Sequence, residues 1–531
     1  MKIIDRIPFS HLNQLQVSDK TYQTHAETFS DFYRWHPNYE SFGDIIQNKQ
    51  FPQEKRDLLC KVLVGQYTKL NLQDRFVQIQ KLKQSNCFTL VSAHQPSLMG
   101  GPLYVFIKIA NTIHLCNRLK KDFPSFEFIP VYWMGSEDHD IDELNHVWIQ
   151  GNKIQWNQDQ NNAIGRYNTA GLAEIIDILQ QHLGQQKSAE ELIGFLKDCL
   201  TKSVDIQSFY HHFFDFLFGA EGLIVINGDH YELKKSFSSV MKQDLFEQRS
   251  FHLVKQQISK LQNLGFKNQA NPREINLFYF SEQGRNRIIF ENKVYKIVDT
   301  DIQFTAEELE KELDSHPERF SPNVILRPLY QEFLLPNLAF IGGGAEISYW
   351  LERKNQFEYF HIDFPMLIRR NSIMIVETHQ VEKISQLGLR WEDLFLPYDA
   401  LCKKWLETHE NEYDFNAIEQ AIGIVETLFT EKAADVDTTL IASSKALANQ
   451  IRQLSDKLSQ KITKALKNKH EVQCLKLQKI QNQLNLPDQL QERKNGFIYY
   501  RSLYGAKWTK EMIDLLDPFQ KDFLLIQNSE I

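Results

Sequence analysis

Two short apolar runs in the first third of the chain each end at a cluster of small and ionisable residues. Phe88–Ala93 leads into a Gly- and Pro-rich stretch, residues 94–102, and Phe126–Met134 leads into an acidic stretch, residues 135–143. Such short runs, rich in β-branched and aromatic residues, predict buried parallel strands. Between them, residues 103–119 place apolar side chains three or four positions apart, which predicts a helix. The order strand, helix, strand predicts a right-handed βαβ unit.

This crossover would place both polar clusters at the carboxyl ends of neighbouring strands, where ligands of open α/β sheets bind. Two later apolar runs repeat the pattern. Gly222–Asn227 is followed by Asp229, and Leu338–Ile341 is followed by three consecutive glycines. We therefore expect an α/β sheet with several chemically active strand ends along one edge.

The core is expected to span residues 1–380, with a helical lead-in and two connecting insertions at about residues 150–220 and 270–300. In the first insertion, residues 168–218 have the period of helices, and the alternation over residues 145–156 around Gly151 predicts a hairpin. In the second, residues 276–280 and 287–298 alternate apolar and polar side chains. That alternation predicts two antiparallel strands joined by a turn.

From residue 381 onward the pattern predicts long helices. Residues 424–486 contain neither Gly nor Pro, and apolar residues recur at the spacing of a heptad pattern. A polar break at residues 442–444 would divide the pattern into an antiparallel hairpin. An apolar seam of this length has to be covered by the hairpin itself, by a second subunit or by both. We assign residues 381–487 to an α-helical coiled-coil domain and residues 488–531 to a segment that folds back on the core.

Composition and charge narrow the classes of function. Charged residues make up 24% and apolar residues 42% of the chain, which is typical of soluble globular proteins, and the net charge of −8 argues against a nucleic-acid partner. No apolar segment approaches bilayer length and the first residues are charged, so we expect a cytoplasmic protein with no membrane partner. The six cysteines are far apart and form no CxxC pair, which predicts buried thiols.

The strand ends and the second insertion supply the candidate site. The candidate catalytic residues are His94, Glu137, Asp138 and His139. The candidate substrate-binding residues are Gln95, Gly100, Gly101, Lys108, Asp140, Asp229, Arg285, Arg287, Gly342, Gly343, Gly344, Glu346 and Tyr349. Each of them alone is more often a helix cap, a surface charge or a structural histidine. Clustered on one edge, carboxylates and imidazoles shift each other's pKa values and suit acid–base chemistry.

The acidic stretch also suggests a metal site, because carboxylates with an imidazole suit Mg²⁺ or Mn²⁺. Adjacent residues of a strand point to opposite faces, however, and no H-E-x-x-H motif is present, so we assign no metal. A Walker-type loop is also absent. The triple glycine lacks the last glycine of a G-x-G-x-x-G fingerprint, which argues against a dinucleotide oxidoreductase.

Four segments of the chain resemble the bacillithiol biosynthesis cysteine-adding enzymes, the BshC family. They are His94–Lys108, Trp133–Glu143, Asn276–Arg287 and Leu335–Trp350. The resemblance covers essentially the whole chain. It implies a Rossmann-like, nucleotidyltransferase-type core with connecting insertions, and a coiled-coil domain through which the protein forms a homodimer. It also implies a ligase that joins the carboxyl group of L-cysteine to the amine of glucosaminyl malate, in the last step of bacillithiol biosynthesis.

Amide formation requires an activated carboxyl group and a deprotonated amine, so activation by ATP, as an acyl-adenylate or an acyl-phosphate, is the expected route, with ATP/ADP as the expected cofactor. The fold that the resemblance implies would favour the acyl-adenylate. His94 and the turn at Gly100 and Gly101 would hold the activated carboxyl or phosphate. Asp138 or His139 would bind and deprotonate the amine.

The malyl group of the implied substrate is dianionic, so we expect Lys108, Arg285 or Arg287 to bind it. The glycine turn after residue 341 and Glu346 would complete the pocket. Two other hypotheses remain. One is a metal-dependent hydrolase acting on a thiol conjugate or glycoside, and the other is a non-catalytic scaffold built on the long helices.

Overall fold

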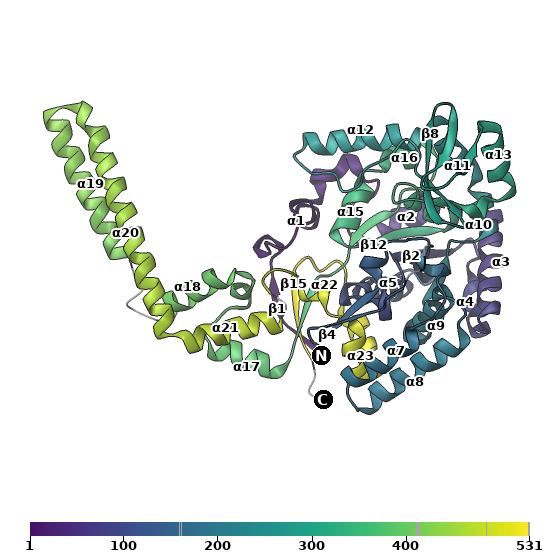
Figure 1. The fold of residues 1–531 in the computed structure, drawn as a ribbon, viewed down its shortest axis with the longest axis horizontal. Helices are drawn as coiled ribbons and strands as arrows, with labels where there is room; N and C mark the ends of the chain where they lie inside the picture. Colours follow the sequence, from purple (N-terminus) through teal and green to yellow (C-terminus); the bar gives the residue numbers. More distant parts are fainter. Residues whose placement is uncertain (159, 161, 410–414, 485, 529–531) are drawn as a thin grey trace. The chain divides into compact units, whose positions relative to one another are not determined.

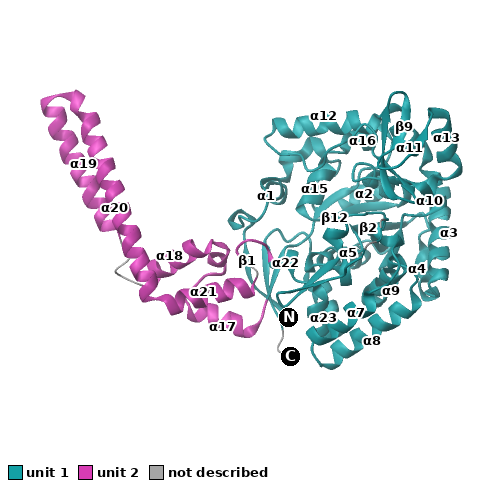
Figure 2. Cartoon of the chain, viewed as in Figure 1, with its two compact units in different colours: residues 1–375, 491–531 teal, residues 376–490 magenta. Residues whose placement is uncertain are grey.

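The computed structural model describes the chain except residues 159, 161, 410–414, 485 and 529–531. The chain folds into two compact units, which Figure 2 distinguishes by colour. The core unit comprises residues 1–375 and 491–531, and the helical unit comprises residues 376–490. The chain therefore leaves the core unit once and then returns to it.

A five-stranded parallel sheet forms the centre of the core unit (Figure 1). Its strand order is β13 (Met366–Arg369), β12 (Asn337–Gly342), β2 (Cys87–His94), β3 (Glu127–Met134) and β6 (Ile224–Asn227). All neighbouring strands run parallel. Helices cover both faces, which explains the nearly continuous apolar runs. The expected α/β class is confirmed, and five carboxyl ends share one edge.

Helix α5 (Leu103–Asp122) connects β2 to β3 and packs against both strands, as the predicted βαβ unit requires. Its other side contacts α23 (Phe497–Leu515), a helix from the end of the chain. The ring centroids of Phe106 and Trp508 lie 4.6 Å apart in this contact. Because α5 is covered on both sides, the apolar residues of the helix extend beyond a single face.

The lead-in and the first insertion are mainly helical. The lead-in contains α1 (Val17–Thr24), α2 (Phe42–Asn48), α3 (Gln53–Lys69) and α4 (Phe76–Lys81). The first insertion contains α6 (Ile141–Leu144), the hairpin of β4 (His146–Ile149) and β5 (Asn152–Gln155), and the helices α7 (Leu172–His182), α8 (Lys187–Lys202) and α9 (Ile206–Phe218). The helices predicted there are confirmed.

The second insertion is an antiparallel sheet with one more turn than the sequence predicted. Its strand order is β10 (Gln303–Phe304), β9 (Val294–Ile297), β8 (Gly284–Glu291), β7 (Leu277–Ser281) and β11 (Phe320–Pro322). The single strand predicted over residues 287–298 is wrong. Asn292 and Lys293 adopt φ values of 52° and 65°, which make a tight turn between β8 and β9. The alternation of apolar and polar residues continues across the turn, so the sequence pattern does not reveal the turn.

Further helices flank the second insertion and follow β12. They are α10 (Tyr231–Ser236), α11 (Ser238–Glu247), α12 (Arg249–Asn263), α13 (Ala306–Ser315), α14 (Arg327–Leu334), α15 (Gly344–Leu351) and α16 (Lys354–Tyr359). Among them, α10 and α15 begin just after strand ends of the central sheet, so they carry side chains to its carboxyl edge.

The helical unit contains α17 (Thr378–Gln386), α18 (Tyr398–His409), α19 (Asn416–Val436), α20 (Ile441–Lys469) and α21 (Glu471–Gln483). Helices α19 and α20 pack together as a hairpin. The predicted antiparallel hairpin is confirmed, but the helices are joined by residues 437–440 and not at the predicted break of residues 442–444. Ser444 remains inside α20, where its hydroxyl donates to the Leu440 carbonyl at 3.2 Å.

A third sheet joins distant parts of the core unit. Its strand order is β1 (Lys2–Ile7), β15 (Phe523–Gln527) and β14 (Ile373–Val376). Helix α22 (Gln491–Lys494) lies beside β14, where the Gln491 side chain bonds both the N–H and the carbonyl of Ile375. Among the described residues, no helix is long and apolar enough to cross a membrane.

Candidate functional site

The carboxyl edge of the central sheet brings together residues that are far apart in the sequence. Strand β2 ends at His94, β3 is followed by Asp138, and β12 is followed by Gly343. A direct hydrogen bond crosses from the first segment to the second, because Gln95 Nε2 donates to Asp138 Oδ2 at 2.9 Å. Asp138 and Glu346 both act electrostatically on His94, which places them close to the same imidazole.

His94 is a neutral imidazole with a defined tautomer. Its Nδ1 lies 2.9 Å from the Gln95 carbonyl oxygen, which can only accept, so Nδ1 carries the proton. Its Nε2 therefore accepts from the Tyr104 hydroxyl at 2.9 Å. Burial and the positive charge of Lys108 lower the pKa of His94 to about 4. Tyr104 is a part of the site that sequence reasoning did not select.

Lys108 connects β2 to the glycine turn after β12. Its ammonium donates to the Ala93 carbonyl at 2.6 Å and to Glu346 Oε2 at 3.0 Å. Glu346 Oε2 also accepts from the Gly343 amide at 2.9 Å, which caps α15. Burial alone would raise the pKa of Glu346, but Lys108 and the Gly343 amide outweigh it, so the pKa is lowered and the carboxylate stays ionised.

A second cation, Arg370, reaches the same turn from the end of β13. Its guanidinium pairs with Glu492 at 2.8 Å, and its Nε is buried without a hydrogen-bond partner among the described residues. A Cβ added to Gly343 would lie 3.6 Å from this Nε. Sequence reasoning missed Arg370, because consecutive arginines at a strand end resemble surface charge.

The turn needs a glycine at position 344 because a carboxylate occupies the space of a side chain. A Cβ there would lie 2.0 Å from Asp19 Cγ. Asp19 is buried and accepts two hydrogen bonds from Arg369, each 3.1 Å long. At position 342, an added Cβ would meet the Phe340 ring at 2.7 Å. Close packing therefore requires small residues in this turn.

Asp138 is an ionised carboxylate that remains partly exposed. Its Oδ1 accepts from the His139 amide at 2.8 Å, and its Oδ2 accepts from Gln95. Burial alone would raise the pKa of Asp138, but the Gln95 hydrogen bond and the charge of Arg285 outweigh it, so the pKa is lowered. The carboxylate is therefore suited to bind a cationic group.

His139 lies beside an arginine from the second insertion. Arg285 Nη1 donates to His139 Nδ1 at 3.0 Å, and the same guanidinium stacks over the Phe278 ring at 3.9 Å. Burial and the charge of Arg285 lower the pKa of His139, so its imidazole is neutral. While Arg285 occupies Nδ1, the proton of the neutral ring resides on Nε2.

Glu137 and Asp229 belong to a network of buried ion pairs. Lys234, whose side chain is fully buried, lies 2.5 Å from Glu137 Oε1 and 2.9 Å from Asp229 Oδ1. Arg166 pairs with both oxygens of Asp229, at 2.7 and 2.9 Å. These cations already neutralise both carboxylates, which favours a role in positioning the loop after β3. Sequence reasoning missed Lys234 and Arg166, because no pattern distinguishes a buried lysine from an exposed one.

Gly100 and Gly101 form a tight structural turn. Their φ values are 80° and 76°, and their amides donate to the Ser97 and Leu98 carbonyls at 2.9 and 3.0 Å. A Cβ on Gly100 would lie 2.4 Å from the Phe497 ring. Since both N–H groups are already bonded within the turn, any contact with a substrate would have to use other atoms. That contact stays a prediction.

The other candidates lie at the margin of this cluster. Asp140 is exposed. Arg287 is opposite Phe278 in the β7–β8 register, on the same face of β8 as Arg285, and its side chain makes no ion pair within the described residues. The Tyr349 hydroxyl accepts from Arg327 at 3.1 Å. Their roles stay predictions.

A cluster of three or more His, Cys, Asp or Glu side chains arranged to hold a metal ion is not present in the described part of the chain. Glu137 and Asp229 are paired with Lys234, and Asp138 is bonded by donors. The carboxyl edge instead combines an ionised carboxylate, two neutral imidazoles and buried cations. That combination suits binding of an amine beside an anionic group, with proton transfer between them.

Comparison with known proteins gives two matching family models. Residues 3–371 match "Bacillithiol biosynthesis BshC, N-terminal Rossmann-like domain", and residues 373–528 match "Bacillithiol biosynthesis BshC, C-terminal coiled-coil domain". These matches confirm the Rossmann-like and coiled-coil parts of the expected fold class.

Relatives similar over nearly the whole chain carry the name "Putative cysteine ligase BshC". The protein from Flavobacterium johnsoniae is 36% identical over 93% of this chain and 94% of its own length. That from Flavobacterium psychrophilum is 35% identical over 94% of both chains. A more distant relative from Bacillus thuringiensis is 27% identical over 90% of this chain and 91% of its own.

Proposed function

The chain belongs to the BshC family of bacillithiol biosynthesis, and on this premise we propose that it is the ligase that joins L-cysteine to glucosaminyl malate through an amide bond. The observation that carries the proposal is that one edge of the sheet holds both the ionised Asp138 and the buried cations Lys108 and Arg370. An amide-forming site has to hold an ammonium group beside an activated, anionic acyl group.

Asp138 would hold the sugar ammonium through its ionised carboxylate. Its lowered pKa makes it a good partner for a cation and a weak base, so another group has to remove the proton. His139 is suited to that role once Arg285 leaves its Nδ1. A malyl carboxylate that drew Arg285 into an ion pair would free this nitrogen to accept the proton. Binding of the substrate would thereby make His139 Nδ1 available as the base.

Lys108 and Arg370 would hold the activated acyl group. Each is a buried cation at the Gly343 turn that already pairs with a glutamate, but Arg370 Nε is unpartnered among the described residues and offers a donor to an added anion. ATP would supply the activation by turning a carboxylate oxygen into part of a phosphate leaving group. The neutral His94, with Tyr104 bonded to it, lies beside Lys108 and would position the acyl group.

Isotope transfer tests the activation directly. L-Cysteine labelled with ¹⁸O in both carboxylate oxygens is incubated with glucosaminyl malate, ATP and the protein, and the products are analysed by mass spectrometry. We expect bacillithiol only when ATP is present, with one labelled oxygen in AMP for an acyl-adenylate or in phosphate for an acyl-phosphate. Bacillithiol formed without ATP, or without oxygen transfer, would contradict ATP activation.

We further propose that the helical hairpin mediates a homodimer. Several apolar residues of α19 and α20 remain exposed: Ile418, Ile424, Leu428, Phe429, Val436, Leu447, Leu454 and Leu458. Leu454 and Leu458 lie one turn apart on α20 and are 66% and 60% exposed. The packing of α19 on α20 leaves this surface uncovered, and a second copy presents the same helical surface.

Light scattering after gel filtration measures the assembly. We expect twice the 62.5 kDa mass of one chain for the wild type, and the single-chain mass for Leu454→Glu combined with Leu458→Glu. Gln453→Glu is the matched control, since it adds a charge at an exposed position of the same helix. A wild type of single-chain mass at micromolar concentration, or a double variant that stays dimeric, would rule out this interface.

A further inference from the structure

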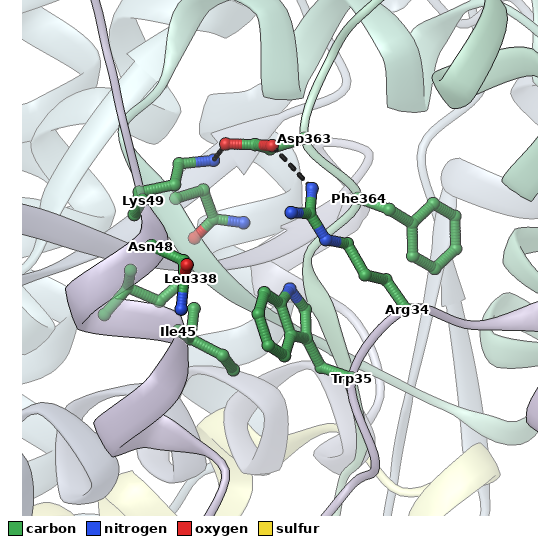
Figure 3. A pocket seen from close by; sticks show the side chains of 9 residues that line it. Arg34, Trp35, Ile45, Asn48, Lys49, Leu338, Asp363 and Phe364 are labelled. Carbon is green, nitrogen blue, oxygen red and sulfur yellow. Dashed lines mark hydrogen bonds and ion pairs between the residues drawn. The ribbon is translucent and has the colours of Figure 1, made fainter.

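A cleft of about 450 Å³ lies in the core unit, away from the candidate site. It shares Lys49 and Asp363 with a smaller adjoining pocket, shown in Figure 3, that is lined by Leu338 at the start of β12. Gly342 ends the same strand. Because a strand rises about 3.3 Å per residue, this pocket and the Gly343 turn are separated by about 17 Å. The cleft therefore belongs to the amino edge of the sheet.

One wall of the cleft carries a glutamate whose second carboxylate oxygen has no donor in the described part of the chain. Glu332 is only 2% exposed, and its Oε1 accepts from the side-chain amides of Gln331 and Asn337, both at 2.8 Å. Its Oε2 has no hydrogen-bond partner among the described residues. The nearby Lys49 forms its ion pair with Asp363, at 3.5 Å (Figure 3). Burial raises the pKa of Glu332 to about 7.

The same cleft carries an ammonium group with no counter-ion among the residues that the structure describes. Lys55 Nζ lies 3.3 Å from the centroid of the Phe333 ring and 5.8 Å from that of Phe51. Within the described part of the chain it makes no ion pair. Burial, together with the charge of Lys49, lowers the pKa of Lys55 to about 8. Aromatic faces stabilise the cation only partly.

We propose that this cleft binds a small zwitterion, a molecule that carries both a carboxylate and a protonated amine. The carboxylate would pair with Lys55, and the ammonium group would donate to Glu332 Oε2. Glu332 Oε2 is buried without a donor and the half-buried Lys55 makes no ion pair among the described residues, so each group gains from the pairing. A simple anion would pair with Lys55 but would be repelled by an ionised Glu332. A simple amine would pair with Glu332 but would be repelled by Lys55. Phe51 and Ile362, which also line the cleft, would contact the ligand's apolar part.

Methyl NMR on the full chain tests the proposal. Isoleucine δ1 methyl groups are labelled with ¹³C, and the Ile362 signal is assigned with Ile362→Val. L-Serine, acetate, ethylamine and inorganic phosphate are then titrated separately. We expect L-serine to shift the Ile362 signal at a concentration at least about tenfold lower than any of the other three. An equal response to acetate, ethylamine or phosphate, or no response at about 50 mM serine, would overturn the proposal.

Variants then locate the binding groups. Glu332→Gln keeps the shape of the side chain and Lys55→Met keeps its apolar length, and each should weaken L-serine binding about tenfold or more. Lys61→Met is the matched control on α3, because Lys61 is exposed and pairs with Glu232. Asp138→Asn should leave the Ile362 response unchanged, which separates this cleft from the ligase site. Wild-type affinity in either Lys55→Met or a folded Glu332→Gln would overturn the proposal.

Discussion

Replacing Lys234 with methionine should strongly destabilise the core unit. The Lys234 side chain is fully buried and its Nζ lies 2.5 Å from Glu137 and 2.9 Å from Asp229. Breaking a buried ion pair from one side typically costs about 3–5 kcal/mol. Asp229 would keep its two bonds to Arg166, so we expect a loss of about 3 kcal/mol, at the lower end of that range.

Urea unfolding, followed by circular dichroism and by tryptophan fluorescence, measures this loss. Lys61→Met is the control, because an exposed pair such as Lys61–Glu232 contributes about 0–1 kcal/mol. The pH dependence gives a second test. Burial alone would raise the pKa of Asp229, but the charges of Lys234 and Arg166 outweigh the effect of burial, so the pKa of Asp229 is lowered. Its ionised form therefore stabilises the fold above about pH 4, and this stabilisation is lost as the pH falls through the folded pKa.

The difference between the Lys234→Met variant and the wild type should thus be largest at neutral pH and shrink below about pH 4. A loss under about 1 kcal/mol at pH 7 would refute the assignment of Lys234 as the cation that neutralises both carboxylates. A loss that stays the same from pH 7 down through the folded pKa of Asp229 would show that missing packing, and not missing charge, destabilises the variant.

Two other predictions concern the turn after β12 and the buried imidazole. Gly344→Ala should cost about 1–3 kcal/mol in thermal or urea unfolding, because its Cβ would lie 2.0 Å from Asp19 Cγ. Gly423 lies in α19, and a Cβ added there would meet no atom within 4 Å, so Gly423→Ala should instead raise the free energy of unfolding by about 0.5–1 kcal/mol. Equal changes in the free energy of unfolding for the two variants would contradict the steric argument. An NMR titration should place the pKa of His94 at about 4, with folding destabilised as the pH falls from about 6.5 towards that value. Lys108→Met should raise the pKa, and an unchanged value would show that Lys108 does not act on this ring.

The sheet was predictable from the sequence because its strands are buried on both faces. The runs at Phe88–Ala93 and Phe126–Met134 lie within β2 and, apart from Phe126, within β3. Right-handed crossovers then place their carboxyl ends on one edge. The turn at Asn292–Lys293 could not be found in the same way, because alternation persists through a two-residue turn and Lys293 is not a typical turn residue.

The candidate site was predictable as a set of strand ends, but the pairing of its charges was not. The order of strands and crossovers places the residues that follow each apolar run on the same edge, and these residues include His94, Asp138 and Gly343. Which cation neutralises which carboxylate depends on three-dimensional packing. Lys234 comes from a helix after β6, and its sequence neighbour Lys235 is not part of the network. Sequence spacing alone does not separate these two lysines.

The rate of bacillithiol formation by Asp138→Asn tests most directly whether the carboxyl edge is the ligase site. The amide keeps the size of the side chain but removes the charge that would hold the sugar amine. With ATP, L-cysteine and glucosaminyl malate supplied, we expect kcat/KM to fall by about 100-fold or more while the unfolding curve stays close to that of the wild type. Wild-type turnover in the folded variant would contradict the account.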